Sequence, residues 1–162
     1  MARFDLQEGD YSVGDVRLAI VASRFNLPIA DRLLQGALAA LGRHGIAEQD
    51  VTVVRVPGAF EIALAAQRLA ASGRFQAIIT LGAVVRGDTP HFDYVAGECA
   101  RGVAAVALKY DLPVIFGVLT VDNVEQALAR AGGEHGNKGD EAALAALEMV
   151  SLLRRMSDPS TS

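Results

Sequence analysis

Four short apolar runs, each followed by a segment with helical spacing, constrain the fold of this chain more than any other feature. The runs cover residues 16–22, 51–56, 77–85 and 114–121, and they are rich in β-branched residues and have no polar face. Such runs are typical of strands in a parallel sheet that helices cover on both sides. Strands that alternate with helices are joined by right-handed crossovers. The sequence therefore predicts a three-layer α/β sandwich around a four-stranded parallel sheet.

The segments between these runs carry helix start and stop signals. Asn26 and Pro28 can cap and open a first helix, which should end at the glycines near position 42. Asp122 and Glu125 have the spacing of a capping box. Further helices are expected over residues 61–72, after the loop at 86–90, over 122–130 and over about 140–153.

Length and composition set the broad class of protein. The 162 residues fit a single domain over 1–162, with loose terminal segments at 1–15 and 157–162. A net charge of −4 with 21% charged residues excludes a disordered chain and a polybasic nucleic-acid binder. Hydrophobic residues make up 51%, but no run is long enough to span a bilayer, so we expect a soluble protein with no membrane partner. The first residues do not read as a signal peptide and Cys99 has no disulfide partner, which favours the cytoplasm.

Several cofactor and nucleophile patterns are missing from the sequence. Residues 22–26 read ASRFN where a dinucleotide fingerprint would stand, and GNKG at 136–139 does not fit a phosphate loop. The three histidines and Cys99 lack metal-ligand spacing, and no Gly-x-Ser-x-Gly elbow occurs. We therefore expect an activity with no cofactor and no metal.

In parallel α/β sheets, ligands bind beyond the carboxyl ends of the strands. The segments that follow the four runs, at 23–26, 57–61, 86–91 and 122–138, should therefore carry the function. They contain motifs in a fixed order: RFN at 24–26, VPGAFEI at 56–62, LGAVVRGDTPHFDYV at 81–95, FGVLT at 116–120 and NKG at 137–139. Together these motifs resemble the lumazine synthase family, over about residues 16–153.

The resemblance implies a flavodoxin-like fold and a transferase of riboflavin biosynthesis that needs no cofactor. The implied reaction condenses 5-amino-6-(D-ribitylamino)uracil with 3,4-dihydroxy-2-butanone 4-phosphate. Its product is 6,7-dimethyl-8-ribityllumazine, with release of phosphate and water, which is the penultimate step of the pathway.

The resemblance also implies a set of site residues, with His91 as the catalytic one. Those expected to bind the ribitylaminouracil are Phe25, Ala59, Phe60, Glu61, Ala83, Val84, Val85, Phe116 and Lys138. Those expected to bind the phosphate are Asp88, Thr89 and Arg130.

The charged candidates each have an alternative interpretation. An imidazole titrates near neutral pH, so His91 can transfer protons, but it can also be an ordinary surface histidine. Asp88 can orient that imidazole or complement a helix dipole. Arg130 has the planar fork that suits phosphate, although a cation at a helix C-terminus is a commoner role. Lys138 either contacts the pyrimidine oxygens or is simply solvated.

The remaining candidates are equally open on sequence alone. Phe25, in a polar loop, either stacks on a flat heterocycle or plugs the core. Glu61 can cap a helix, accept hydrogen bonds from polyol hydroxyls, or do both. Cys99 lies eight residues after His91, so a nucleophilic pair is conceivable, but its apolar neighbours favour a small buried residue.

Assembly is the last feature that the resemblance implies. The family forms pentamers and, in many members, icosahedral cages of sixty chains, with sites between adjacent subunits. The short connection at 132–136 permits such a cage. Riboflavin synthase is the protein partner that the resemblance suggests. Two other functions fit the same residues: a flavin- or pterin-binding carrier, and a shell protein without turnover.

Overall fold

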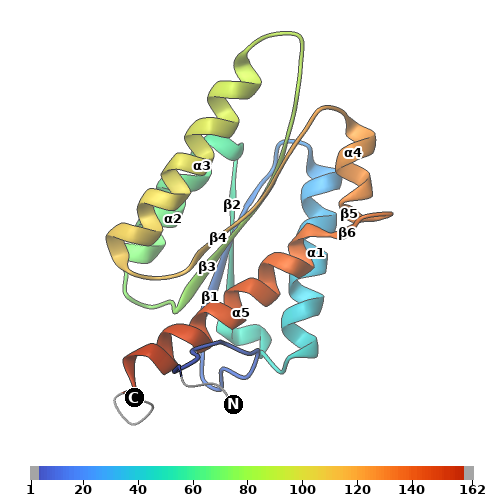
Figure 1. The fold of residues 1–162 in the computed structure, drawn as a ribbon. Coiled ribbons are helices and arrows are strands. Elements are labelled where there is room, and N and C mark those ends of the chain that lie inside the picture. Colours follow the sequence, from blue (N-terminus) through green and yellow to red (C-terminus); the bar gives the residue numbers. More distant parts are fainter. Residues whose placement is uncertain (1–3, 159–162) are drawn as a thin grey trace.

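Four parallel strands form the centre of the protein in a computed structural model that describes residues 4–158 (Figure 1). The strands are β1 (Leu18–Ser23), β2 (Val51–Val56), β3 (Ala77–Val85) and β4 (Val114–Val121). Their order in the sheet is β2-β1-β3-β4, and each neighbouring pair is parallel. The last three strands have the predicted bounds, and the first begins two residues later than predicted.

Helices cover both faces of this sheet. The helices are α1 (Leu27–Arg43), α2 (Ile62–Ala71), α3 (His91–Tyr110), α4 (Val124–Ala129) and α5 (Lys138–Ser157). Two short 3₁₀ helices, η1 (Glu48–Asp50) and η2 (Ala59–Glu61), flank β2. Figure 1 shows α1 and α5 on one side of the sheet and α2 and α3 on the other. The predicted three-layer, flavodoxin-like sandwich is confirmed.

The core consists of two clusters, one on each face of the sheet. Leu18 and Ile20 of β1 pack toward α1 and α5, whereas Ala19 and Val21 pack toward α2 and α3. All four side chains are fully buried. Because successive side chains of a strand point to opposite faces, a strand covered on both sides must be apolar throughout. This is why the central runs lack a polar face.

Strand β2 differs from that expectation. Thr52 and Val53 are exposed, and Val53 keeps 40% of its surface accessible. The strand lies at the edge of the sheet and pairs only with β1. The prediction that all four runs are covered on both faces is therefore wrong for β2, because only its Val51, Val54 and Val56 pack against the two core clusters.

The start of α4 also differs from the prediction. Asn123, not Asp122, is the N-cap, and its side chain accepts a hydrogen bond from the backbone N–H of Gln126. The Gln126 side chain in turn accepts from the backbone N–H of Asp122. This arrangement resembles a capping box set one residue later than the predicted Asp122–Glu125 pair. Asp122 is instead the acceptor for the side chain of Arg86.

A small hairpin joins α4 to α5 and was not predicted. Strands β5 (Ala131–Gly133) and β6 (Gly136–Asn137) pair antiparallel around the turn. The Asn137 side chain then caps α5 by accepting from the backbone N–H groups of Gly139 and Asp140. The hairpin therefore fixes the point at which α5 begins.

Residues 4–15, expected to be a loose terminal segment, are irregular but attached to α5. The Asp10 carboxylate accepts from the Ser151 hydroxyl and pairs with Arg155. The pKa of Asp10 is lowered, mainly because its carboxylate accepts a hydrogen bond from the Ser12 backbone N–H. The contacts with Ser151 and Arg155 lower this pKa further. Val13 is buried. At the other end α5 extends to Ser157, and the remaining residues of the expected loose ends, 1–3 and 159–162, lie outside the described part.

Candidate active site

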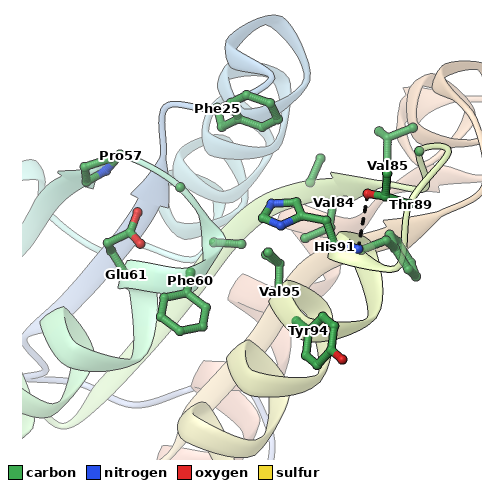
Figure 2. Close-up of a pocket in the computed structure, with 15 residues that line it drawn as sticks. Phe25, Pro57, Phe60, Glu61, Val84, Val85, Thr89, His91, Tyr94 and Val95 are labelled. Atoms are coloured by element: carbon green, nitrogen blue, oxygen red, sulfur yellow. Dashed lines mark hydrogen bonds between the residues drawn. The ribbon is translucent and has the colours of Figure 1, made fainter.

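A cavity at the carboxyl edge of the sheet lies between η2 and the start of α3 and has a volume of about 670 Å³. We call it the aromatic cavity. It is lined by Phe25, Pro57, Gly58, Ala59, Phe60, Glu61, Ala83, Val84, Val85, Gly87, Thr89, His91, Phe92, Tyr94 and Val95. Nine predicted site residues are among these, and they come from the ends of three different strands. Figure 2 shows Phe25, Phe60, Glu61 and His91 around one opening.

Phe25 is held at this cavity by its backbone. The N–H of Arg24 donates to Val56 O at 2.8 Å, and that of Phe25 donates to Pro57 O at 3.0 Å. The Phe25 ring remains 68% exposed. A ring that plugged the core would be buried, so the alternative of a core plug is wrong. A flat apolar surface at the mouth of a cavity is suited to stacking on a heterocycle.

Glu61 faces the same opening from the end of η2 (Figure 2). It precedes α2 but makes no side-chain cap hydrogen bond there. The capping alternative is therefore wrong, and the carboxylate is available to accept hydrogen bonds from a ligand.

His91 is the first residue of α3, as predicted. Its backbone N–H donates to Thr89 Oγ1 at 3.4 Å, and its imidazole points into the aromatic cavity (Figure 2). Within residues 4–158 no hydrogen bond joins Asp88 to His91, and Asp88 does not line the cavity. Thr89, rather than Asp88, therefore contacts the residue that carries the imidazole.

Three residues on α3, Phe92, Tyr94 and Val95, line the cavity although the sequence analysis did not assign them to the site. Tyr94 and Val95 follow His91 by three and four positions, which places them on the same face of a helix. That spacing is a signal that could have found them once His91 was placed at the helix start.

The loop between β3 and α3 is fixed by Arg86. Its Nε lies 3.0 Å from Asp122 Oδ1, its Nη1 lies 3.7 Å from Asp93 Oδ1, and its guanidinium stacks 4.4 Å from the Phe92 ring centroid. Arg86 therefore links the loop that carries Thr89 to both the start of α3 and the end of β4.

A second cavity, of about 530 Å³, lies beside β4 and the start of α5. We call it the basic cavity. It is lined by Phe116, Val118, Leu119, Thr120, Val121, Arg130, His135, Lys138 and Glu141. Three predicted residues meet here, namely Phe116, Arg130 and Lys138. The sequence analysis did not assign His135 or Glu141 to a site, although Glu141 follows Lys138 by three positions on α5, a spacing that could have found it.

The basic residues of this cavity are tied together through the backbone. Arg130 Nη1 donates to Gln126 O at 3.0 Å, and the N–H of Lys138 donates to Arg130 O at 2.8 Å. Three side chains that can carry positive charge, Arg130, His135 and Lys138, thus face one space. Such a grouping is suited to an anion.

The predicted site is therefore divided in two within one chain. The aromatic cavity and the basic cavity share no lining residue in the part of the chain that the structure describes. Neither cavity alone contains all the groups expected for a phosphorylated substrate and a heterocycle.

Cys99 takes no part in either cavity. It is fully buried on α3, and burial raises the pKa of its thiol to about 11. A thiol that resists ionisation is a poor nucleophile, so the structure supports a small buried residue.

Residues 4–158 contain no group of three or more His, Cys, Asp or Glu side chains that could hold a metal ion. None of the helices in this range has the length and apolar character that a membrane span requires.

A comparison with protein families shows which family the chain belongs to. The family model of 6,7-dimethyl-8-ribityllumazine synthase matches residues 15–154. The chain belongs to this family.

Membership confirms the expected reaction. As a lumazine synthase family member the chain is a transferase of riboflavin biosynthesis, and it forms 6,7-dimethyl-8-ribityllumazine from ribitylaminouracil and the phosphorylated butanone. Its substrates are small molecules. Residues of the RFN, VPGAFEI and LGAVVRGDTPHFDYV motifs line the aromatic cavity of this lumazine synthase. Residues of the FGVLT and NKG motifs line its basic cavity.

Proposed function

We propose that the aromatic cavity of one subunit and the basic cavity of its neighbour form one complete lumazine synthase site. The observation that carries this proposal is the division of the site residues between two cavities that share no residue. A heterocycle with a polyol chain suits the first cavity, and a phosphate suits the second.

In this arrangement the aromatic cavity binds ribitylaminouracil. Phe25 stacks on the pyrimidine, and the backbone of residues 83–85 contacts its edge, since the Ala83 and Val84 side chains are buried in the core. Glu61 accepts hydrogen bonds from the ribityl hydroxyls. Ala59 and Phe60 form the wall beside it.

His91 transfers protons during the condensation. The substrate's own amine is the nucleophile, so the protein must position two reactants and move protons rather than supply a covalent intermediate. The imidazole at the opening of the cavity is placed to exchange a proton with the amine or with the leaving oxygen (Figure 2).

The phosphate is bound from both sides of the subunit boundary. Arg130 of the neighbour binds it from one side, and Thr89 with the adjacent Asp88 backbone completes the phosphate site from the chain that carries His91. Phe116 and Lys138 of the neighbour contact the ribitylaminouracil instead. Backbone N–H groups in the exposed loop at 86–90 can donate to the phosphate oxygens.

Exposed apolar side chains support a symmetric assembly. Phe60, Leu64, Tyr94 and Leu108, on η2, α2 and α3, are 56%, 66%, 69% and 86% exposed in the single chain. Large apolar residues gathered on one layer mark an interaction surface. We propose a closed ring of five chains, which can assemble further into the icosahedral cage; riboflavin synthase is the proposed partner, and the cytoplasm the proposed location.

Complementation tests the shared site. Phe116→Asp and His91→Ala chains, each nearly inactive alone, are co-assembled in equal amounts and assayed with both substrates. For random placement around a head-to-tail ring, about one quarter of the sites (½ × ½) receive an intact His91 and an intact neighbouring Phe116. Mixed rings that stay as inactive as either parent, with mixing confirmed by mass, contradict the shared site.

A matched control uses wild-type chains mixed equally with the double variant Phe116→Asp/His91→Ala. A shared site again predicts about one quarter of the sites to be intact, whereas a site built within one chain predicts about one half. The two experiments together therefore distinguish the arrangements without relying on absolute rates.

A further inference from the structure

Asn26 has an unusual backbone conformation next to the aromatic cavity. Its φ of 57° and ψ of 48° place it in the left-handed region, which among the described non-glycine residues only Asp111 shares. Asparagine tolerates this region better than most residues do. Asn26 is the N-cap of α1, but its side chain makes no cap hydrogen bond. The amide is therefore free of the task that an asparagine usually performs at this position.

The Asn26 side chain instead reaches the neighbouring strand. Its Nδ2 donates to Ala83 O at 3.2 Å. The ladder between β1 and β3 ends at the pair Ala22 and Leu81, so Ala83 lies two residues beyond it. The side-chain amide thus continues the attachment of β1 to β3 past the point where backbone pairing stops.

Together with the backbone bonds of residues 24 and 25, this contact fastens the RFN loop on both sides. Arg24 and Phe25 donate to the end of β2 and the residue after it, and Asn26 donates to the end of β3. Phe25 therefore lies between the end of β2 and the end of β3, and the RFN loop fixes the distance between these two walls of the cavity.

We infer that Asn26 is a positioning residue that sets the Phe25 ring against the end of β3 before the pyrimidine binds. This inference rests on the proposed role of the aromatic cavity. Asn26 supplies two properties at once, a left-handed backbone and an amide donor. A site whose walls are fixed in advance loses less conformational freedom on binding, and this raises affinity.

Two substitutions remove the amide donor of Asn26 and leave its left-handed backbone accessible. Asn26→Gly keeps the left-handed backbone at no steric cost and removes the donor, whereas Asn26→Asp keeps the shape but places a carboxylate against the Ala83 carbonyl. Both are expected to raise KM for ribitylaminouracil, Asn26→Gly by about tenfold, as for loss of one hydrogen bond, and Asn26→Asp by more. KM for the phosphorylated butanone should stay within about twofold of wild type, because neither Arg130 nor the loop at 86–90 is changed.

Asp111→Gly is the matched control. It makes the same kind of backbone change at the other left-handed residue, at the C-terminal end of α3, away from both cavities. Its KM values should equal those of wild type. Thermal midpoint and assembly mass are measured for every variant. Loss of assembly in Asn26→Gly, or equal rises in both KM values, would mean a structural role and would overturn the inference.

A double-mutant cycle with Phe25→Ala tests whether Asn26 acts through the ring. If it does, Asn26→Gly should add less than about twofold to KM in the Phe25→Ala background. Full additivity overturns the positioning role. A wild-type KM for ribitylaminouracil in Phe25→Ala would instead contradict the proposed function of the aromatic cavity. If this KM is raised in Phe25→Ala but equals that of wild type in Asn26→Gly, only the inference about Asn26 is contradicted.

Discussion

Gly139 of α5 lies so close to Leu33 of α1 that a Cβ on the glycine would stand 1.9 Å from the Leu33 carbonyl oxygen. The contact is between two backbones, which cannot move apart without separating the helices. Because Gly139 follows Lys138, the same approach sets where the basic cavity receives its lysine. The NKG motif thus has a packing requirement as well as a proposed binding role.

Gly139→Ala is expected to lower the free energy of unfolding by about 3 kcal/mol, the cost of forcing two packed backbones apart. Urea denaturation at a fixed chain concentration measures this. Gly42→Ala in α1 is the control, because a Cβ there meets nothing within 4 Å. The control should be unchanged or more stable by about 0.5 kcal/mol. Equal stability of the two variants would contradict the close approach.

Ser23→Ala is expected to stabilise the protein. Ser23 is fully buried, and its hydroxyl has no hydrogen-bond partner within residues 4–158. Removing a buried unsatisfied hydroxyl should raise the free energy of unfolding by about 1 kcal/mol. Thr80→Val is the control, because the Thr80 hydroxyl donates to Ile115 O at 2.7 Å and its loss should destabilise by about 1 kcal/mol. A destabilised Ser23→Ala would show that the hydroxyl has a partner.

The buried Cys99 should make stability fall at high pH. Burial raises the pKa of its thiol to about 11, so between about pH 9 and 11 the unfolded chain has lost the proton while the folded chain retains it. The free energy of unfolding is therefore expected to decrease as pH rises through this range, and less steeply in Cys99→Ala. Native protein at pH 8 should also resist iodoacetamide, and denatured protein should react. Rapid native alkylation would contradict the burial.

His91→Ala and Arg130→Ala should differ in their kinetic effects. Loss of proton transfer lowers kcat, by about a hundredfold, whereas loss of a phosphate contact mainly raises KM for the phosphorylated butanone, by tenfold or more. Steady-state rates with each substrate varied in turn separate these effects. His44→Ala, at the end of α1, and Arg74→Ala, just before β3, are controls that should retain wild-type constants. A saturated rate within about twofold of wild type in His91→Ala would remove proton transfer as its role.

Much of this fold follows from local patterns. Residues 77–85 and 114–121 are apolar runs with sharp ends, and the structure ends both strands where the pattern does. The β5–β6 hairpin was not predicted because both strands and the turn between them lie in a glycine-rich stretch without apolar alternation. Exposure of β2 was also missed, since a sequence does not say how far the helices extend over each strand.

The grouping of residues in the aromatic cavity follows from the sequence, whereas the roles of those residues in binding stay predictions. Phe25, Glu61 and His91 follow three strand ends, and parallel strands bring those ends together. Phe116 lies on β4, the edge strand that pairs only with β3. It lines the basic cavity together with Arg130. That separation depends on strand order, which no short motif encodes.

The anchoring of residues 8–13 on α5 has a consequence for how the chain folds. Asp10 contacts Ser151, and the Val13 carbonyl accepts from Arg154, so these bonds join segments about 140 positions apart. During synthesis the N-terminal segment must wait for nearly the whole chain to leave the ribosome before its acceptors are satisfied. The face of the sheet that α1 shares with α5 waits equally long, because α5 supplies much of its cover. Long-range contacts of this kind slow folding and leave apolar surface open in the meantime. Nascent chains stalled before α5 should therefore expose that face and be a preferred substrate of chaperones.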